Sequence, residues 1–244
     1  MVFRQLDAFF ETVLSQHMEQ KRVLSKKDNP VDVLISLWKG QGRGLELTKD
    51  DLKAIILDAL IGGTATSSVT LLWAMSELIK NPRVMKKVQF EIRGKIQDKP
   101  RVQETLRLHP PAPLLFPRET MQHVKIHGYD LPPKTRVFVN AWAIGRDTDC
   151  WKNPEEFYRE RFEDVGVDFQ GLNFEFLPFG AGRRICSAIP MANMNVEFTL
   201  ASLLHSFDWK LPVGLRREDV SMEEMGRQIV CRSSPLCLFP FPYM

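Results

Sequence analysis

The sequence predicts a mainly α-helical fold with small β-sheets, an α+β class. A stretch of about 30 residues from Leu52 is apolar on most helical faces, as in a long helix buried inside a protein. Shorter amphipathic helical runs lie on both sides of it. Two short runs, 124–127 and 135–141 (TRVFVNA), have strand composition. The 244 residues show no internal repeat and suffice for one large or two small domains.

The first 80 residues predict two helices with a shorter apolar stretch between them. Apolar residues recur at helical spacing near the N-terminus, which favours an amphipathic helix of the fold over a signal peptide. A second apolar run covers 31–38. Thr48 and Asp51 stand at capping-box spacing, so we expect a long helix over about 49–80. The apolar positions of the first helix are Leu6, Phe9, Phe10, Val13 and Leu14.

The segment GGTATSS, 62–68, predicts an interruption of this long helix. Two glycines weaken a helix interior by about 0.8–1 kcal/mol each relative to alanine. Hydroxyl side chains next to them can bond freed backbone carbonyls. Two interpretations stay open at this point: a helix boundary, or a local opening where another group approaches the backbone.

The rest of the chain alternates short elements with loops. Asn81, as cap, and Pro82 begin a helix that we expect to reach about Ile96. A short helix over about 101–108 ends before a Pro-rich stop. A turn at 131–133 separates the two predicted strands, and a long irregular stretch follows. The remaining expected segments are that stretch at 145–179, a loop at 176–190, a helix over about 191–205 and strand-like runs within 229–238.

Composition excludes several classes of function. Lysine and arginine (33) nearly balance aspartate and glutamate (30), and the net charge of +3 predicts no nucleic-acid partner. The four cysteines form no CxxC and lie in no zinc-finger spacing, which favours a reducing environment. We find no run of about 18 apolar residues and therefore expect no transmembrane helix.

The stretch FLPFGAGRRIC, 176–186, holds the most informative cysteine. A dinucleotide loop is disfavoured because Ile185 stands where GxGxxG needs its third glycine. A thiolate just before a helix is stabilised by free N–H groups, and glycines let the preceding turn pass under a flat cofactor. Arg184 stands two residues before Cys186 and can bind a carboxylate. A thiolate-ligated haem needs these features together.

Glu104 and Arg107 lie three residues apart on one helical face. Such a pair is most often a surface salt bridge of little energetic value. The apolar Leu106 between them and the downstream sequence RERF, which contains Arg161, keep open the alternative of a buried Glu–Arg–Arg network.

Taken in chain order, these segments resemble the cytochrome P450 superfamily of haem-thiolate monooxygenases, and within it the plant microsomal A-type clan. The resemblance runs from end to end and corresponds to the C-terminal half of the family fold, so residues 1–244 are expected to form a partial domain. The segments that carry it are GGTATSS, ETLRLHPPAPLLFPRET, WKNPEEFYRERF, FLPFGAGRRIC and SPLCLFP.

The resemblance implies a role for each matching position. Cys186 is expected to be the axial thiolate of haem b (iron protoporphyrin IX), with Thr66 delivering protons to dioxygen as the catalytic residue. The expected cofactor-binding residues are Phe179, Gly180, Gly182, Arg184 and Arg118, with the two arginines on haem propionates. The expected structural network is Glu104, Arg107 and Arg161, and the expected substrate-pocket residues are Leu114, Leu115, Ile229 and Val230.

The implied reaction inserts one atom of dioxygen into a small apolar plant metabolite of specialised metabolism. Electrons come from NADPH through a flavoprotein reductase. Full-length members sit on the cytosolic face of the endoplasmic reticulum through an anchor that precedes the matching region. For this fragment alone, the alternatives are that membrane and the cytosol.

Four departures from the family pattern keep two other hypotheses open. The chain has half the usual length, Ala65 replaces an acid, and the connector from Arg93 to Glu104 is short. Ser187-Ala188 replaces the family's Pro-Gly after the cysteine, so that Ser187 gives up a first-turn proline. Arg159 replaces a family proline before Glu160. One alternative is an inactive truncated copy or mis-predicted gene product without haem, and a weaker one is a haem-thiolate isomerase or dehydratase.

Overall fold

The computed structural model describes residues 2–19, 29–40, 47–94, 102–163 and 166–243. The chain divides into two compact units, Met1–Thr64 and Ala65–Met244, with the division inside the long helix. The larger unit contains every residue to which the resemblance assigns a role.

The smaller unit is built from α1 (Val2–Glu19), α2 (Pro30–Lys39) and the start of α3 (Lys49–Lys80). One residue of each helix, Leu14, Ile35 and Leu52, forms its small core. The predicted capping box is confirmed. The backbone N–H of Thr48 donates to Asp51 Oδ2 (2.8 Å), and that of Asp51 donates to Thr48 Oγ1 (3.1 Å).

Helix α3 continues from Lys49 to Lys80 through GGTATSS without a break, so the predicted interruption is wrong. The hydroxyl of Thr70 donates to Thr66 O within the helix (2.9 Å), a bond that leaves helical geometry intact. The glycine cost of about 1 kcal/mol each is small beside the hydrogen bonds and core packing of a 32-residue helix.

Helix α3 bears on the expectation that the chain has no transmembrane helix. It is long and apolar enough to cross a membrane, with a mean hydropathy of 1.6 over its most apolar window. Length and composition alone are weak support, because core helices of soluble proteins pass the same test. Its C-terminal part contributes Trp73, Ala74 and Leu78 to the buried core.

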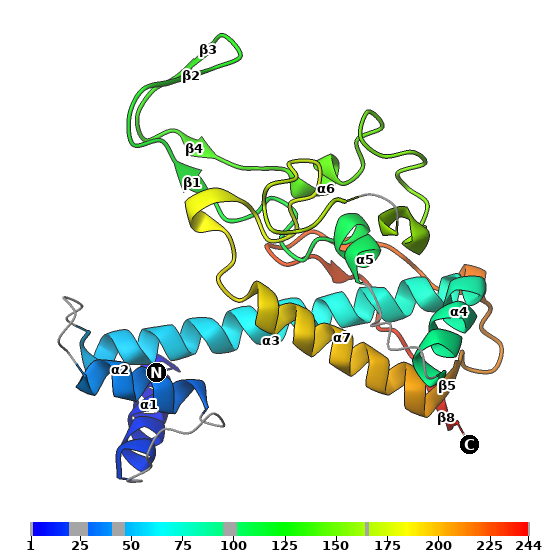
Figure 1. Ribbon diagram of the computed structural model, residues 1–244, viewed down its shortest axis with the longest axis horizontal. Helices are drawn as coiled ribbons and strands as arrows, with labels where there is room; N and C mark the ends of the chain where they lie inside the picture. The colour runs from blue at the N-terminus through cyan, green and yellow to red at the C-terminus, as the bar shows by residue number, and fades with distance from the viewer. Residues whose placement is uncertain (1, 20–28, 41–46, 95–101, 164–165, 244) are drawn as a thin grey trace. The chain divides into compact units, whose positions relative to one another are not determined.

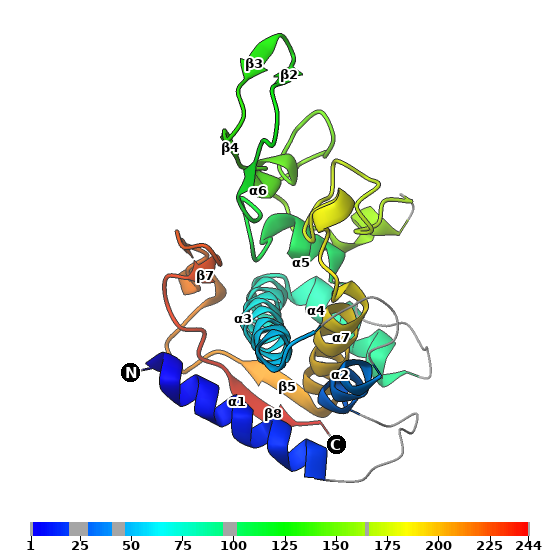
Figure 2. The ribbon, with the colours of Figure 1, turned by 90° about the vertical axis from the view of Figure 1, so that its left-hand side faces the viewer.

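The larger unit packs its helices around one hydrophobic cluster. Helices α4 (Pro82–Arg93), α5 (Gln103–Leu108) and α7 (Ile189–Ser206) surround the C-terminal half of α3 (Figures 1 and 2). Helix α5 has the expected end, and α7 begins two residues before the expected helix. The shorter elements are α6 (Ala141–Ile144) and the 3-10 turns η1 (Arg159–Phe162), η2 (Gly182–Arg184) and η3 (Arg217–Asp219).

Four antiparallel two-stranded sheets complete the described part of this unit. The pairs are β1 (Arg118–Glu119) with β4 (Arg136–Val137), β2 (Val124–Ile126) with β3 (Tyr129–Leu131), β5 (Phe207–Lys210) with β8 (Phe239–Pro242), and β6 (Glu224–Met225) with β7 (Cys231–Arg232). The β2–β3 hairpin projects from the body of the unit (Figure 1).

The predicted strand pair is only partly correct. The strand at 124–127 is present one residue shorter, but it pairs with β3 across a turn in which His127 (φ +47°) and Gly128 (φ +87°) are left-handed. The expected turn at 131–133 therefore follows β3. The strand expected at 135–141 ends at Val137, because Asn140 caps α6 through a bond from Ala143 N (3.0 Å).

The cap expected at the start of α4 is not formed. Asn81 precedes the helix as predicted, but its amide donates to Glu77 O (2.9 Å) and caps the end of α3 instead. The helix ends at Arg93, and the expected extension to about Ile96 lies outside the described residues. Ser187 precedes α7, whose first turn contains Pro190, so that turn does have a proline.

Candidate functional site

Backbone bonds close the cysteine loop between the core and α7. The N–H of Cys186 donates to Phe179 O (3.0 Å), and that of Ile185 donates to Gly182 O (3.1 Å). The ring of Phe179 packs on the core and meets Phe169 edge-on, with centroids 5.4 Å apart. The sequence thus folds into a tight loop that presents the cysteine just before the helix.

Two glycines of this loop have left-handed backbones that disfavour other residues. Gly180 has φ +75° and Gly182 has φ +69°. A third glycine, Gly171, was missed by sequence reasoning. It has φ +81°, and a Cβ there would lie 2.9 Å from Ile185 Cδ1, so the neighbouring chain can approach closely only because the side chain is absent.

The thiol of Cys186 is exposed and borders a pocket of about 530 Å³. The lining is mixed, and besides the thiol its polar groups are Gln170 and, on α7, Asn193 and Glu197. The Oδ1 atom of Asn193 is buried without a hydrogen-bond partner in the described part of the chain. The apolar lining residues are Phe169, Ile189, Pro190 and Met194.

The other cysteines differ from Cys186 in their surroundings. Cys150 is exposed, but desolvation and the nearby charge of Asp147 raise the pKa of its thiol, which disfavours a thiolate. Cys231 is half-buried in β7, and Cys237 is exposed in the tail. Of the four, only Cys186 follows two arginines, three and two residues before it, in a loop that precedes a helix.

Of the two arginines expected at the cofactor, Arg118 contacts the loop from β1 and Arg184 belongs to the loop itself. Arg118, in β1, donates from Nη2 to Ala181 O (3.4 Å). A Cβ on Gly180 would lie 3.8 Å from that nitrogen and 4.0 Å from Arg184 O. The side chain of Arg184 is exposed on η2. The Leu115 backbone is left-handed (φ +51°), and its side chain also packs beside Gly180.

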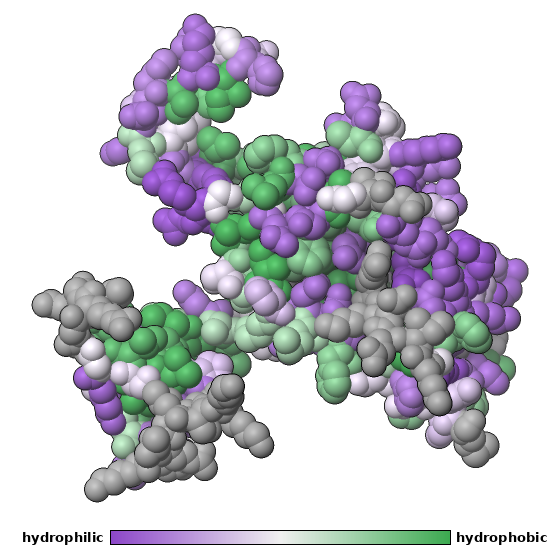
Figure 3. Space-filling view, in the orientation of Figure 1, coloured by the Kyte–Doolittle hydropathy of each residue, from purple (hydrophilic) through white to green (hydrophobic). Residues whose placement is uncertain are grey.

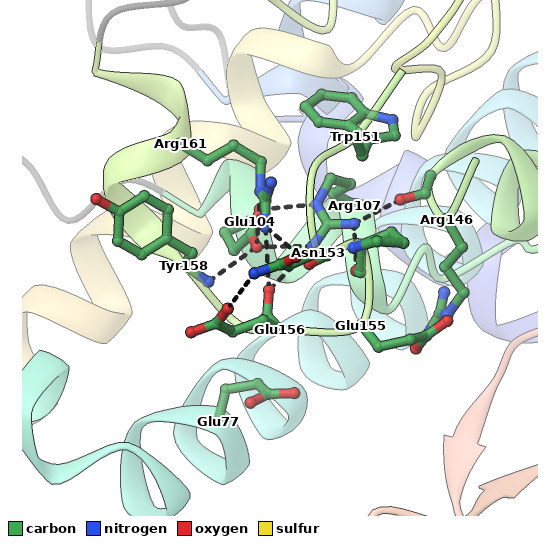
Figure 4. Close-up of polar contacts among 12 residues, drawn as sticks. Glu77, Glu104, Arg107, Arg146, Trp151, Asn153, Glu155, Glu156, Tyr158 and Arg161 are labelled. Atoms are coloured by element: carbon green, nitrogen blue, oxygen red, sulfur yellow. Dashed lines mark hydrogen bonds and ion pairs between the residues drawn. The ribbon is translucent and has the colours of Figure 1, made fainter. Parts of the chain in front are cut away.

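The Glu–Arg–Arg network is buried, which excludes the surface salt bridge (Figure 4). The Arg107 guanidinium donates from Nε and Nη2 to the two oxygens of Glu104 (2.8 and 2.7 Å). Arg161 Nε lies 3.4 Å from Glu104 Oε1, which also accepts from Tyr158 N (3.0 Å). Glu104 and Arg107 are each only 1% exposed.

Backbone carbonyls satisfy the rest of these guanidinium groups. Arg107 Nη1 donates to Pro154 O (2.7 Å), and Arg161 Nη2 donates to Asn153 O (3.1 Å). Arg159 departs from the family pattern. Its Nη1 lies 2.8 Å from Glu91 Oε2 on α4 and forms an ion pair there, but not a hydrogen bond. The network therefore ties α5 to the irregular stretch around residue 155.

The remaining predicted residues lie on three separate segments. Thr66 is half-buried within α3, and Leu114 is exposed in the loop before β1. Val230 is buried against Val69 and Trp73, with Ile229 partly buried beside them. The roles of Thr66 and Leu114 stay predictions.

Comparison with known proteins gives one family. The sequence model of that family, described as Cytochrome P450, matches residues 2–238. A zebrafish cytochrome P450 solved with abiraterone superposes with a TM-score of 0.79 at 25% identity, over 98% of this chain and 59% of that one. A second zebrafish structure, with progesterone, gives 0.74 at 26% identity, over 96% and 56%.

Plant proteins are similar at higher identity. A 4-hydroxyphenylacetaldehyde oxime monooxygenase from Sorghum bicolor is 51% identical over 259 residues, which cover 99% of this chain and 49% of that protein. Cytochrome P450 71B26 from Arabidopsis thaliana is 49% identical, with 99% and 51% covered. The chain spans about half the length of these relatives. Because 259 exceeds 244, at least 15 positions of the Sorghum protein have no counterpart here.

Proposed function

Because this chain belongs to the cytochrome P450 family, we propose that it is the haem-binding half of a haem-thiolate monooxygenase with Cys186 as the axial ligand. The family implies haem as the cofactor, a small-molecule substrate and a redox partner. The observation that carries the proposal is the exposed Cys186 thiol in a closed loop with two left-handed glycines and two adjacent arginines.

The residues present fit a flat, largely apolar group with acidic edges. Gly180 turns the loop beside Arg118 with a left-handed backbone (φ +75°), which residues with a side chain rarely adopt. Phe169, Ile189, Pro190 and Met194 supply the apolar part of the pocket beside Cys186, and Arg118 and Arg184 supply cations for carboxylates. When bound, the haem supplies the oxygen-activating redox chemistry, which the thiolate promotes by donating electron density.

The chain's own residues would hold the ligand sulfur and exclude water. The N–H of Cys186 bonds Phe179 O, which fixes the direction of the Cys186 backbone. Phe179 packs between the core and Phe169 and keeps water from one side of the loop. Thr66 is the proposed proton donor on α3, next to Ala65 where the family places an acid.

The finer functional proposals concern substrate, electrons and location. We propose a small apolar plant metabolite as substrate, with Leu114, Leu115, Ile229 and Val230 lining its pocket. The relatives that are 49% and 51% identical to this chain come from plants, which supports a plant metabolite. NADPH supplies the electrons through a flavoprotein reductase, and the full-length protein works at the cytosolic face of the endoplasmic reticulum.

A second candidate function is a chain that does not hold haem by itself. Hydrophobic residues of α7 are exposed, among them Met194 (65%) and Phe198 (72%). Hydrophobic residues also lie among hydrophilic ones on the face of the larger unit that Figure 3 shows. Exposed apolar area of this kind marks an interface or a chain prone to aggregate. The weaker isomerase or dehydratase alternative depends on Ala65 alone.

The reduced, CO-bound absorption spectrum of the purified full chain tests the proposal. We expect a thiolate-type Soret band after haem is added, and its loss in Cys186→Ala. Cys237→Ala removes another exposed thiol and should keep the band. A soluble, folded chain that takes up no haem would establish the second candidate instead, and a band retained in Cys186→Ala would exclude Cys186 as the ligand.

A further inference from the structure

His109 lies at the end of α5 inside a buried cluster that the P450 site does not use. It is 5% exposed, and its ring stacks on Trp73 of α3 with centroids 4.0 Å apart and planes 2° from parallel. Its Nε2 lies 2.8 Å from Glu77 Oε1 on α3, and its Nδ1 lies 3.2 Å from Glu224 Oε1 on β6. One imidazole therefore bridges two carboxylates from distant parts of the chain.

With both carboxylates ionised, the two ring contacts are hydrogen bonds only if both nitrogens of His109 donate. A neutral imidazole carries one N–H, so one of its two carboxylate contacts would lack a proton. The other carboxylate oxygens are occupied: Glu77 Oε2 accepts from Asn81 Nδ2 (3.2 Å), and Glu224 Oε2 accepts from Trp142 Nε1 (3.0 Å). Both carboxylates are thus arranged as acceptors, and the protonated imidazolium satisfies them.

The same cluster holds the segment that contains Val230. Trp73, which stacks on His109, donates from Nε1 to Val230 O (3.0 Å), and Val230 N donates to Pro111 O (3.0 Å), two residues after His109. Arg232 Nη1 donates to Ser76 on α3 (2.8 Å). Residues 229–232 are therefore attached to α3 and to the end of α5 through the surroundings of this one ring.

We propose that His109 is a buried imidazolium that holds residues 229–232 against α3, and that loss of its proton to solvent loosens this segment. The electrostatics agree with the geometry. Burial alone disfavours the charge, but the hydrogen bonds of Glu224 and Glu77 outweigh it and raise the pKa of His109 above its ordinary 6.5. Burial opposes the shift of Glu224, yet the bond from His109 lowers the pKa of that carboxyl.

We call the attachment of residues 229–232 to α3 through His109 the clamp. The two pKa shifts define the pH range in which it is stable. The contribution of His109 is fully present below pH 6.5 and is lost as pH rises through its raised pKa in the folded chain. The contribution of Glu224 is present above pH 4.5 and is lost as pH falls through its lowered pKa. Two other cations lie nearby: Arg146, whose charge helps keep Glu224 ionised, and Arg232, 5.6 Å from the Trp73 ring.

Loosening of Val230 would affect substrate binding only if the proposed function holds, because only then does Val230 line the substrate pocket. The clamp itself does not depend on haem, so its test uses the full chain without haem or substrate. If the chain binds no haem, the proposed function fails, but the experiments below still confirm or contradict the clamp.

The first measurement is an NMR titration of the five histidine rings from pH 5 to 9. We expect His109 to stay protonated above pH 6.5, the ordinary pKa of histidine. Glu224→Gln should lower the His109 midpoint by about one to three pH units. A His109 ring that titrates at or below pH 6.5 would overturn the proposal. Glu224→Gln also assigns the resonance if His109→Gln does not fold.

The second measurement is hydrogen exchange at Val230 N–H, expressed as a protection factor to remove the intrinsic pH dependence. Protection should fall about tenfold or more above the His109 midpoint, and should be low at every pH in His109→Gln. Tyr243 N–H, bonded to Ser206 O (2.9 Å), is the control and should keep its protection. Equal loss at both amides, or no loss at Val230, would contradict a local clamp.

Discussion

The Glu104–Arg107–Arg161 network and the Cys186 loop differ in how far the chain satisfies their polar groups. In the network, carboxylate oxygens and backbone carbonyls of this chain meet the guanidinium groups, and Glu104 and Arg107 are 1% exposed. In the loop, the thiol and the Arg184 side chain face outward. The first region is complete as a scaffold, whereas the second presents groups suited to an external ligand. This difference separates residues that stabilise the fold from residues that bind.

The largest expected effect on stability comes from Arg107→Leu. It leaves the Glu104 carboxylate buried beside a more distant cation, and removing one partner of a buried pair costs about 3–5 kcal/mol. Chemical denaturation followed by circular dichroism measures the loss, which is large enough to unfold a marginal chain.

Arg83→Leu is the matched control for this variant. Arg83 is two-thirds exposed on α4 and contacts Glu160 at 3.2 Å, so its loss should cost less than about 1 kcal/mol. Equal losses in the two variants would show that the buried network is not the scaffold, and would remove the contrast with the loop.

The smallest expected effect on stability comes from Arg184→Leu and Arg183→Leu in η2. Both side chains are exposed, so either change should alter the free energy of unfolding by less than about 0.5 kcal/mol. Haem affinity should separate them. Loss of a charged hydrogen bond from Arg184 costs about 1.5–3 kcal/mol, or roughly 10- to 150-fold, whereas Arg183→Leu should bind as the parent does.

Haem titration monitored by absorption distinguishes the two arginine variants. Equal weakening in both would show that general positive charge, rather than Arg184, attracts the cofactor. A large loss of stability in Arg184→Leu would instead place this arginine in the scaffold and make the two regions alike.

Local patterns predicted the elements that depend on neighbours in sequence. The bonds of Thr48 with Asp51 span three residues, and the pairing of Glu104 with Arg107 spans the same distance. The sequence indicated a tight turn at the loop glycines, and the structure adds that Gly180 and Gly182 are left-handed there. The family itself, with its mainly helical fold and small sheets, was recognised from such segments and is confirmed by the family match.

The missed features depend on contacts between distant residues. His109 meets Glu77 across 32 positions and Glu224 across 115, and no local pattern announces such a cluster. The predicted break at GGTATSS failed because weak propensity was judged without the core packing of α3. The left-handed His127–Gly128 turn could have been found, since glycine at the second turn position is a hairpin signal.

Thiol labelling tests the central claim most directly, since the claim is that Cys186 faces the haem. The full chain is treated with a maleimide, with and without haem, and labelled peptides are quantified by mass spectrometry. Cys150, Cys186 and Cys237 are all exposed without haem and should all react. We predict that haem protects Cys186 and leaves Cys150 and Cys237 reactive. Haem that binds without protecting Cys186, or that protects all three alike, would contradict the account.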